Sequence, residues 1–464
     1  MTKKAAFLIS MSFFSFFINQ TSWAEPERME LISAADRSFT YGYSQSQRVE
    51  RFERIILERN AKELSEKEGL EPKGLDEQPL RVYRSIRVAT LYDSNLFYDH
   101  NDPKDDLIYL YSPSLGFELG KAGVTRGFLT TYYDMTYANY SENHKLSRLN
   151  HAHSVAMGFH AGKFDFRLTN LFQPASAHET GARTELASAG NNQAIAYSDT
   201  ATAGITYHWT PKVALSGDYQ YTVYYFPASS SAGRGIRRFS NQQHGISPRI
   251  TYQVTPKTSV DFGGVFTTTD YFSNGDKSSK TYGVSAGFGH RLTPKTDIGF
   301  QMGYDTQDYN LPIYPSAEGP KFSAILRHEF SPKLVGSISA SHQLGEAFDL
   351  TEEALEATSF RTAADNYRAD LAWEINPRMT LGAYAALQAN ARDGLYTFAD
   401  PENPAAVSTS TLEDQIYTSG IRWKWKPRTG WTYFLAYDFL EKFSSFKEES
   451  YDDHKVGGSA RVIF

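Results

Sequence analysis

Residues 367–378 read YRADLAWEINPR, and this short stretch decides the fold. Every second side chain is aromatic, aliphatic or alanine, whereas Arg368, Asp370 and Glu374 lie between them. A period of two is typical of a β-strand, whose side chains alternate between two faces. The stretch ends at Asn376-Pro377-Arg378, where proline fixes φ and removes a ladder donor. The sequence therefore predicts a strand with one apolar face that runs into a tight turn.

The same ending recurs along the chain. An apolar residue, a polar residue, proline and a basic residue follow one another at Trp209–Lys212, Val254–Lys257, Leu292–Lys295, Phe330–Lys333, Ile375–Arg378 and, with Lys426 as the polar residue, Trp425–Arg428. The six prolines are separated by 45, 38, 38, 45 and 50 residues, enough for two strands and one further connection. This is a hairpin repeat; a solenoid of soluble repeats would be more regular and would lack the strand alternation.

Counting strands by this alternation predicts an all-β fold of about eighteen strands between residues 81 and 464. Their predicted ranges are 82–93, 107–119, 126–138, 149–161, 163–172, 196–209, 212–226, 240–254, 258–272, 279–292, 297–309, 319–330, 333–345, 364–375, 379–391, 413–425, 430–442 and 452–464. Most are long enough to cross a bilayer at a tilt. Short proline turns at one end and longer connections at 173–195, 346–362 and 392–412 indicate an outer-membrane barrel with both termini in the periplasm.

Closure and membrane insertion follow from the apolar face. Every backbone group in hydrocarbon must be hydrogen-bonded, so an apolar-faced sheet there must close into a barrel. Aromatic residues beside the turns are expected to form an interfacial girdle in contact with outer-membrane lipid; these are Trp209, Phe330, Trp373, Trp425 and Trp431. The soluble alternatives, a large β-sandwich or a propeller, would present a polar outer face and shorter strands.

The N-terminal residues predict export. Lys3 and Lys4 precede an apolar stretch from about Ala5 to Ile18, and Ser22-Trp23-Ala24 is a small-x-small cleavage site. We interpret residues 1–24 as a secretory signal peptide; an N-terminal membrane anchor is the alternative. Residues 25–80 are charged and helix-favouring, and are expected to form a periplasmic amphipathic helix, a flexible arm or a solvated leader.

Composition limits the function. Without Lys3 and Lys4 the charge falls from −6 to −8, which argues against nucleic-acid binding. There is no cysteine. No nucleophile elbow, HExxH motif or P-loop is present, so the sequence predicts neither an enzyme nor a bound cofactor. His151 and His153 share a strand face, and residues 101–106 carry three aspartates, but solvated side chains explain both better than a zinc or calcium site.

The inner parity of the strands carries charges of both signs, which we take as candidate pore-lining residues. They are Arg249, Arg291, Arg327, Arg368, Arg422, Arg461, Asp218, Asp261, Asp305, Asp370, Glu374 and Asp438. One interpretation is a self-neutralised wall of cross-strand ion pairs. The other is a rim of guanidinium groups that attracts an anionic solute or polymer. Tyr224 and Phe434 on the same parity would stack on sugar rings or fill space.

The last strand ends on Phe464, with Val456, Gly458, Ala460 and Val462 on the same parity. This ending resembles the terminal signal that the barrel-assembly machinery binds, although Ser459 stands where glycine is expected.

The first predicted hairpin carries the most specific pattern. Leu91-Tyr92-Asp93-Ser94-Asn95-Leu96-Phe97 is followed by Asp105 and by Tyr111-Ser112-Pro113-Ser114-Leu115-Gly116-Phe117-Glu118-Leu119. This resembles the opening hairpin of the β-barrel porin 2 family, and hairpin period extends the resemblance over about residues 85–464. The family implies an outer-membrane barrel without catalytic residues, and some members resemble exopolysaccharide-secretion components.

These observations predict a channel for hydrophilic solute. Polysaccharide export, with separate periplasmic secretion partners, is the first hypothesis; a general diffusion porin is the second. A third is a structural or adhesive surface barrel with a plugged lumen. A diffusion porin would usually narrow its pore with an inward loop, for which 173–195 is the candidate.

Overall fold

The computed structural model describes residues 80–96, 101–120, 127–176, 195–225, 240–272, 278–310, 316–345, 358–397, 407–444 and 450–464. The predicted signal peptide and the extension 25–80 lie outside these residues, as does most of 173–195.

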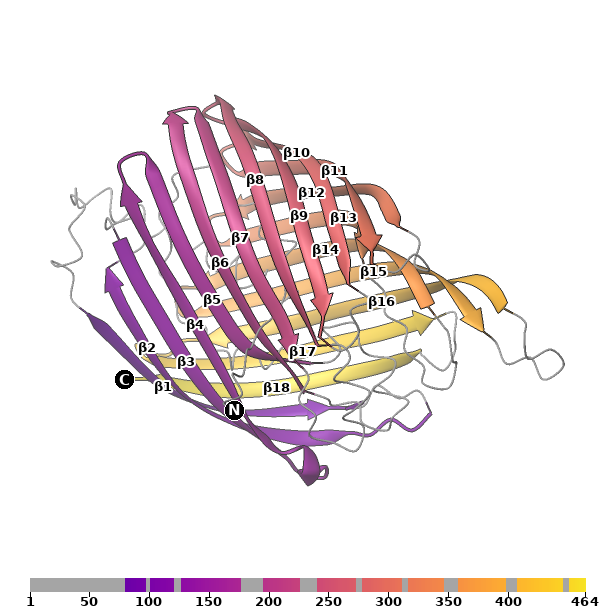
Figure 1. The fold of residues 1–464 in the computed structure, drawn as a ribbon. Helices are drawn as coiled ribbons and strands as arrows, with labels where there is room; N and C mark the ends of the chain where they lie inside the picture. Colours follow the sequence, from indigo (N-terminus) through magenta and orange to yellow (C-terminus); the bar gives the residue numbers. More distant parts are fainter. Residues whose placement is uncertain are drawn as a thin grey trace, which may run out of the picture.

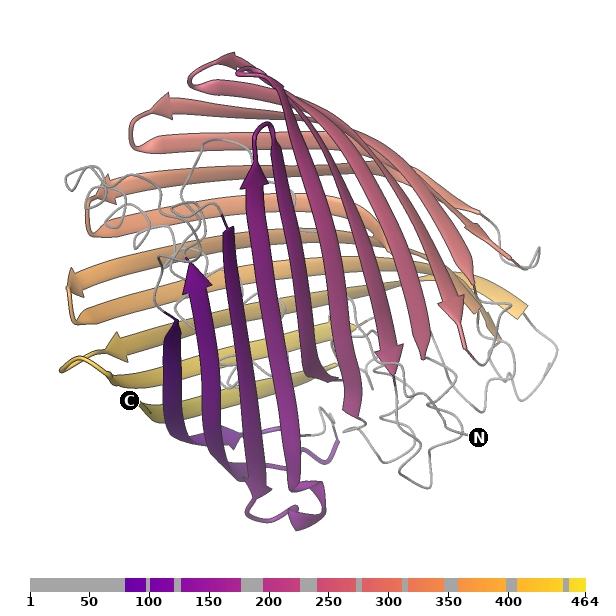
Figure 2. The same ribbon diagram turned by 60° about the vertical axis from the view of Figure 1, so that its left-hand side comes forward.

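Eighteen antiparallel strands form one closed sheet (Figures 1 and 2). Each strand pairs with its sequence neighbours, and β1 pairs with β18 to complete the ring. The strands are β1 (Arg81–Asp93), β2 (Asp106–Gly120), β3 (Gly127–Tyr140), β4 (Arg148–Ala161), β5 (Phe164–Ser176), β6 (Ile195–Thr210), β7 (Val213–Tyr225), β8 (Asn241–Thr255), β9 (Thr258–Tyr271), β10 (Ser279–Thr293), β11 (Thr296–Tyr309), β12 (Ala317–Ser331), β13 (Leu334–Gly345), β14 (Thr358–Asn376), β15 (Met379–Thr397), β16 (Val407–Trp425), β17 (Trp431–Ser444) and β18 (Tyr451–Ile463). The predicted all-β barrel and its strand number are confirmed.

The largest differences from the predicted ranges are at β14, β15 and β16. Each has 19 residues, and they extend into the segments 346–362 and 392–412, which we had expected to be loops. β5 likewise continues to Ser176, inside the predicted connection 173–195. The prediction failed because these extensions are polar and lack the apolar alternation that marks a lipid-facing strand. A 3-10 turn at His144–Leu146 joins β3 to β4. Among the described residues no helix is long and apolar enough to span a membrane.

The Tyr92-Asp93-Ser94-Asn95 motif closes the barrel. Lys455 on β18 lies between two buried carboxylates, 2.9 Å from Asp93 and 3.0 Å from Asp453. Next to it, the His454 N–H donates to the Ser94 hydroxyl, and the Ser94 N–H donates to the His454 carbonyl. The motif therefore joins the first strand to the last at the end of the barrel with the long connections.

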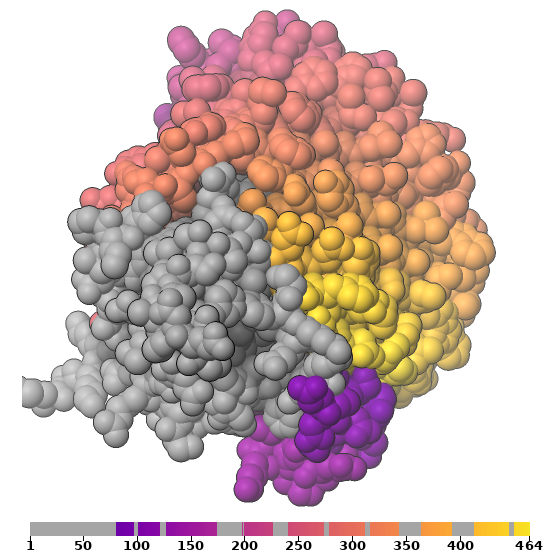
Figure 3. Space-filling model, turned by 90° about the vertical axis from the view of Figure 1, so that its right-hand side faces the viewer, coloured from indigo at the N-terminus to yellow at the C-terminus, as the bar shows by residue number. Residues whose placement is uncertain are grey.

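The opposite end of the seam is joined by the last residue. The Phe464 N–H donates to the Arg84 carbonyl over 2.8 Å, while 73% of the residue stays exposed. Figure 3 shows the C-terminal strands (yellow) beside the N-terminal ones (indigo) in one continuous curved wall. Residues of β1 and β18 that are more than 370 positions apart in the sequence thus complete the hydrogen-bonded ladder.

The outer face is apolar. Ile338, Phe262, Trp209 and Phe330 are each about 60% exposed on this face. Apart from Ile463 at the end of β18, the exposed large apolar side chains within each strand lie on one face of that strand. Of the five predicted girdle residues, Trp209, Phe330, Trp373 and Trp425 are exposed on this face near the tight turns. Trp431 is half-buried, and the guanidinium of Arg428 lies 4.5 Å from its ring centroid. A sheet with this outer face is stable in lipid and not in water.

The polar residue before each turn proline has a structural task. The side-chain oxygen of Thr210, Thr255, Thr293, Ser331 or Asn376 accepts the N–H of the basic residue two positions later, over 2.9–3.2 Å. These are the side-chain-capped turns that serine, threonine and asparagine favour. The carbonyl of the same basic residue accepts an N–H from the following hairpin, as between Lys257 and Arg291. Successive turns are therefore linked into one rim, which we call the turn rim.

Proline also occurs inside strands, which our argument from the turn prolines did not anticipate. Pro113 lies within β2 and Pro248 within β8, and the backbone ladders to β3 and β9 are interrupted there without a change of register. Beside Pro113, the hydroxyls of Ser112 and Thr136 are hydrogen-bonded at 2.9 Å, at the position of the missing pair. Side-chain bonding thus holds the strands together where proline cannot donate.

The seam yields a stability prediction. Lys455→Met removes the cation between Asp93 and Asp453, and breaking a buried ion pair in this way costs about 3–5 kcal/mol of unfolding free energy. Lys104→Met is the matched control, since Lys104 pairs with Asp102 at an exposed site and such pairs contribute about 0–1 kcal/mol. Urea unfolding of the refolded barrel, followed by tryptophan fluorescence, measures both. Equal stability of the two variants would show that the barrel closes without this network.

Candidate functional site

The candidate site is the inner wall of the barrel. All twelve charged residues predicted for it alternate with the exposed apolar side chains of their strands and so lie on the inner face. Most of them are arranged in ion pairs, and the pairs differ in how far they are exposed.

A buried network crosses four strands, from β14 to β17. Tyr384 on β15 lies between two guanidinium groups. Its ring centroid is 4.5 Å from Cζ of Arg368 and 5.2 Å from Cζ of Arg422. Its hydroxyl reaches over β16 and donates to Asp438 on β17 over 2.7 Å. Arg422 also reaches Asp438, at 3.4 Å, and Arg368 binds Asp370 on its own strand at 2.5–2.9 Å. Cross-strand pairing thus explains Arg422 but not Arg368, whose partner lies two residues along β14.

Glycine makes room for these carboxylates. Asp438 pairs directly with Gly420, and a Cβ at Gly420 would lie 2.5 Å from the Tyr384 ring and 2.9 Å from the Tyr437 carbonyl. The same juxtaposition of an inner aspartate and a glycine on the neighbouring strand occurs at Asp218–Gly204, Asp261–Gly287 and Asp305–Gly283. Each carboxylate folds over the glycine opposite it.

The remaining predicted residues of the middle wall are also engaged. Arg249 lies 3.9 Å from Asp261, and Lys321 binds Asp305. Asp218 interacts electrostatically with Arg167 and Arg249. Arg461 donates to the hydroxyls of Ser85 and Tyr132. The self-neutralised wall is therefore the better description of most of these residues.

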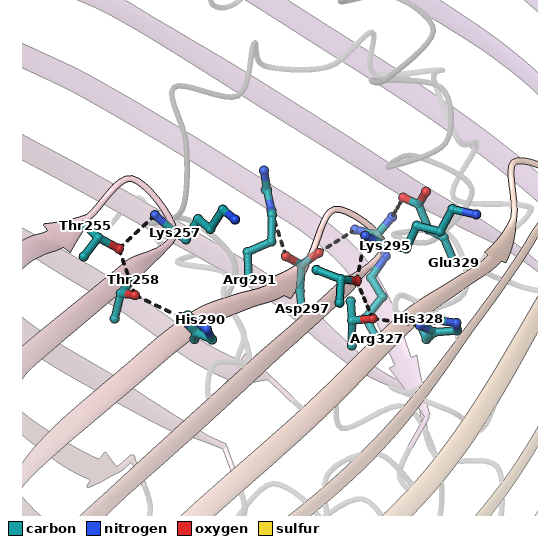
Figure 4. Close-up of polar contacts among 12 residues, drawn as sticks. Thr255, Lys257, Thr258, His290, Arg291, Lys295, Asp297, Arg327, His328 and Glu329 are labelled. Atoms are coloured by element: carbon teal, nitrogen blue, oxygen red, sulfur yellow. Dashed lines mark hydrogen bonds and ion pairs between the residues drawn. The ribbon is translucent and has the colours of Figure 1, made fainter.

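An exposed cluster lies beside the turn rim on β10, β11 and β12 (Figure 4). Asp297 is 3.1 Å from Arg291 and 3.9 Å from Arg327, and Arg327 is 3.4 Å from Glu329. The Arg291 side chain is 49% exposed, against 3% for Arg368. Glu374 lies at the same level, where its N–H donates to the Lys333 carbonyl. Of the predicted arginines, Arg291 is thus the one that a solute at this mouth would meet.

A second exposed cluster was missed in the sequence. Asp165 on β5 is bound through one oxygen to His160 on β4 and through the other to His208 on β6, each at 2.6 Å. All three are partly exposed on the inner face next to the turns. Their inward parity was available from the sequence, but the three lie on different strands and the register was not. Asp297, Lys321 and Tyr384 were missed for the same reason.

The inner wall of β1–β3 carries an apolar cluster among buried polar residues such as Arg87 and Asp134. Leu91, Ile108, Leu110 and Tyr140 belong to this cluster, which Ala436 of β17 joins. Phe434 packs against it, so this ring fills space and is not a free stacking surface. The exposed charges of the two clusters lie instead on β4–β6 and β10–β12.

The side chains that the sequence offered as possible metal ligands have other partners. In the described part of the chain no three histidine, aspartate or glutamate side chains are placed to hold a metal ion. His151 is bound to the hydroxyl of Tyr133 on the outer face. In the acidic segment, Asp106 accepts the N–H groups of Ser141, Glu142 and Asn143 and so anchors the β3–β4 connection.

A comparison with known protein families identifies the family of this barrel. Residues 81–462 match the model of the family described as "Putative beta-barrel porin 2". The chain belongs to this family. The porin is thus an outer-membrane β-barrel channel. The family resemblance that we inferred from the first hairpin is confirmed, and the match extends over the whole barrel. A search of curated proteins finds no match.

Solved outer-membrane proteins have a distantly similar fold. Pseudomonas aeruginosa OpdQ is 8% identical, with a TM-score of 0.45 over 83% of this chain and 98% of its own. P. aeruginosa OpdK, solved with vanillate, is 7% identical, with a TM-score of 0.45 over 82% and 99%. A BenF-like porin from Pseudomonas fluorescens Pf-5 is 10% identical, with a TM-score of 0.44 over 83% and 99%. These similarities carry no substrate over to the porin.

The close approach at Gly420 can be tested directly. Gly420→Ala is expected to separate Tyr384 from Asp438 and to lower the unfolding free energy by about 1–3 kcal/mol, as overpacking does. Gly217→Ala on β7 is the control, because a Cβ there meets nothing within 4 Å. Urea unfolding of both variants measures the difference. An unchanged Gly420→Ala variant would mean that the network does not depend on this glycine.

Proposed function

We propose that the porin is a diffusion channel for small hydrophilic solutes across the outer membrane, with its termini and the turn rim in the periplasm. Membership of a porin family and the separation of the inner wall into sectors support this. A barrel of eighteen strands is wide enough for an aqueous channel. The proposed path runs along β4–β12, where the inner charges are most exposed. It lies away from the apolar cluster on β1–β3.

The inner wall favours small solutes over a polymer. A polysaccharide channel is expected to offer aromatic faces along its path. Two of the inner aromatic residues offer no free face, because Phe434 packs against the apolar cluster and Tyr384 is held between two arginines. Polysaccharide export remains a hypothesis that rests on the family resemblance, and it would need periplasmic secretion partners. A plugged structural or adhesive barrel is the remaining alternative.

We also propose that Phe464 is the contact with the barrel-assembly machinery. The backbone of Phe464 completes the seam to β1, whereas 73% of the surface of this residue is exposed. An exposed terminal ring beside a strand edge is available for recognition before the seam closes.

Single-channel conductance of the refolded protein without residues 1–24 tests the proposed channel. Stable current steps that neutral oligosaccharide leaves open are expected for a diffusion channel. Block by an anionic oligosaccharide at low concentration would favour the export pathway instead. A folded, heat-modifiable barrel that never conducts would contradict both and favour the plugged barrel.

Substitution of two arginines distinguishes a residue that contacts solute from a residue that stabilises the barrel. Arg291→Ala removes an exposed guanidinium, so it is expected to change conductance or ion selectivity while stability falls by only about 0–1 kcal/mol. Arg368→Ala leaves Asp370 buried without its partner, so it is expected to cost about 3–5 kcal/mol of stability. Arg291→Ala should therefore have the larger effect on conductance, and Arg368→Ala should have the larger effect on stability in urea unfolding. If Arg291→Ala left every channel property unchanged, the exposed cluster would not line the path.

A further inference from the structure

Two neighbouring hairpins repeat one hydrogen-bonded chain at the turn rim (Figure 4). In the first, the Lys257 N–H donates to Thr255, the Thr255 hydroxyl donates to Thr258 over 3.0 Å, and Thr258 is bound to Nδ1 of His290 at 2.9 Å. In the second, Lys295, Thr293, Thr296 and His328 make the same bonds at nearly the same distances.

The chain engages one nitrogen of each imidazole. The Thr255 hydroxyl donates to Thr258, and Thr258 is hydrogen-bonded to Nδ1 of His290; Thr293, Thr296 and His328 are bonded in the same order. A neutral histidine whose Nδ1 accepts a hydrogen bond carries its proton on Nε2. In that tautomer, the Nε2–H of each copy lies outside the hydrogen-bonded chain and can donate to a ligand.

These imidazoles lie on the lipid side of the barrel. His290 lies on the same strand face as Phe288 and Leu292, which are 39% and 53% exposed on the outer face. His328 likewise lies between Leu326 and Phe330, which are 41% and 59% exposed. The donors are thus close to the edge of the apolar band, at the depth of lipid headgroups.

Basic residues accompany them at the tips of the turns. Lys257 and Lys295 are exposed, and within the described ranges no carboxylate lies within 4 Å of their ammonium groups. Each follows an exposed outer-face residue by three positions, Val254 and Leu292 respectively. Asp297, two residues after Lys295, pairs instead with Arg291 and Arg327 on the inner face.

We propose that each copy binds the phosphodiester headgroup of an anionic phospholipid in the leaflet that the turn rim faces. The lysine supplies the charge, the histidine Nε2–H donates to a phosphate oxygen, and Leu292 or Phe330 contacts the acyl chain. The orientation rests on the proposed function, in which this rim is periplasmic and faces a phospholipid leaflet. The capped turn holds the backbone of the lysine, and the threonine chain holds the imidazole, before the lipid arrives.

The test uses the refolded protein without residues 1–24 in phosphatidylcholine vesicles with spin-labelled phosphatidylglycerol or spin-labelled phosphatidylcholine. The relative association of the two labels with the barrel is measured at low and high salt. The wild type is expected to prefer phosphatidylglycerol. Lys257→Gln with Lys295→Gln should lower this preference by about five-fold per site at low salt, the factor that corresponds to one cation near a membrane surface.

A second variant separates the hydrogen bonds from the charge. Thr258→Val with Thr296→Val keeps both lysines but frees both imidazoles, and should weaken the preference at high salt, where the lysine contribution is screened. Lys104→Gln with Lys280→Gln, at the other end of the barrel, is the control and should leave the preference unchanged. Heat modifiability establishes that every variant is folded.

Several outcomes would overturn the proposal. One is a folded lysine variant with the wild-type lipid preference. Another is loss of the preference on adding soluble glycerol phosphate at low millimolar concentration, which would make the site one for free phosphate. A change in channel reversal potential with unchanged lipid preference would assign the lysines to the channel mouth. A non-conducting barrel that still selects phosphatidylglycerol would refute the proposed channel and leave the lipid site standing.

Discussion

The structure depends on one constraint: a sheet with an apolar outer face must pair every strand edge. Pairing of β1 with β18 meets it, and the residues that join them are the family's Tyr92-Asp93-Ser94-Asn95 motif and the chain terminus. The turn prolines, their side-chain caps and the linked turn rim keep eighteen strands in register around this closure. A motif that looks like a loop signature is thus a closure device.

Closure leaves the inner face to carry function, and that face is not uniform. Arg368, Arg422 and Asp438 are buried in a network that includes Tyr384, and such a network stabilises a particular register more than it contacts solute. Near the turn rim the pairs open to solvent, as Arg291 shows. Charge sign alone therefore does not identify the channel lining; exposure does.

The sequence predicted the strand number, the turns, and the face of the twelve charged residues proposed to line the pore, because period two and proline position are local properties. It did not predict partners, because these depend on register between strands. The Asp–Gly pairs, Tyr384 reaching across β16, and the His160–Asp165–His208 cluster are all consequences of register. Strand ends were also misjudged where polar extensions of β14–β16 continue beyond the apolar band.

The central claim is that alternate residues of one strand face lipid and water, and the absence of cysteine makes it directly measurable. Single cysteines at Phe300, Gln301 and Met302 of β11 would carry an environment-sensitive fluorophore in vesicles. We expect a membrane-dissolved nitroxide to quench the labels at 300 and 302, and an aqueous quencher to reach only the label at 301. Equal access of the aqueous quencher to all three positions would contradict a membrane-spanning barrel with a water-filled interior.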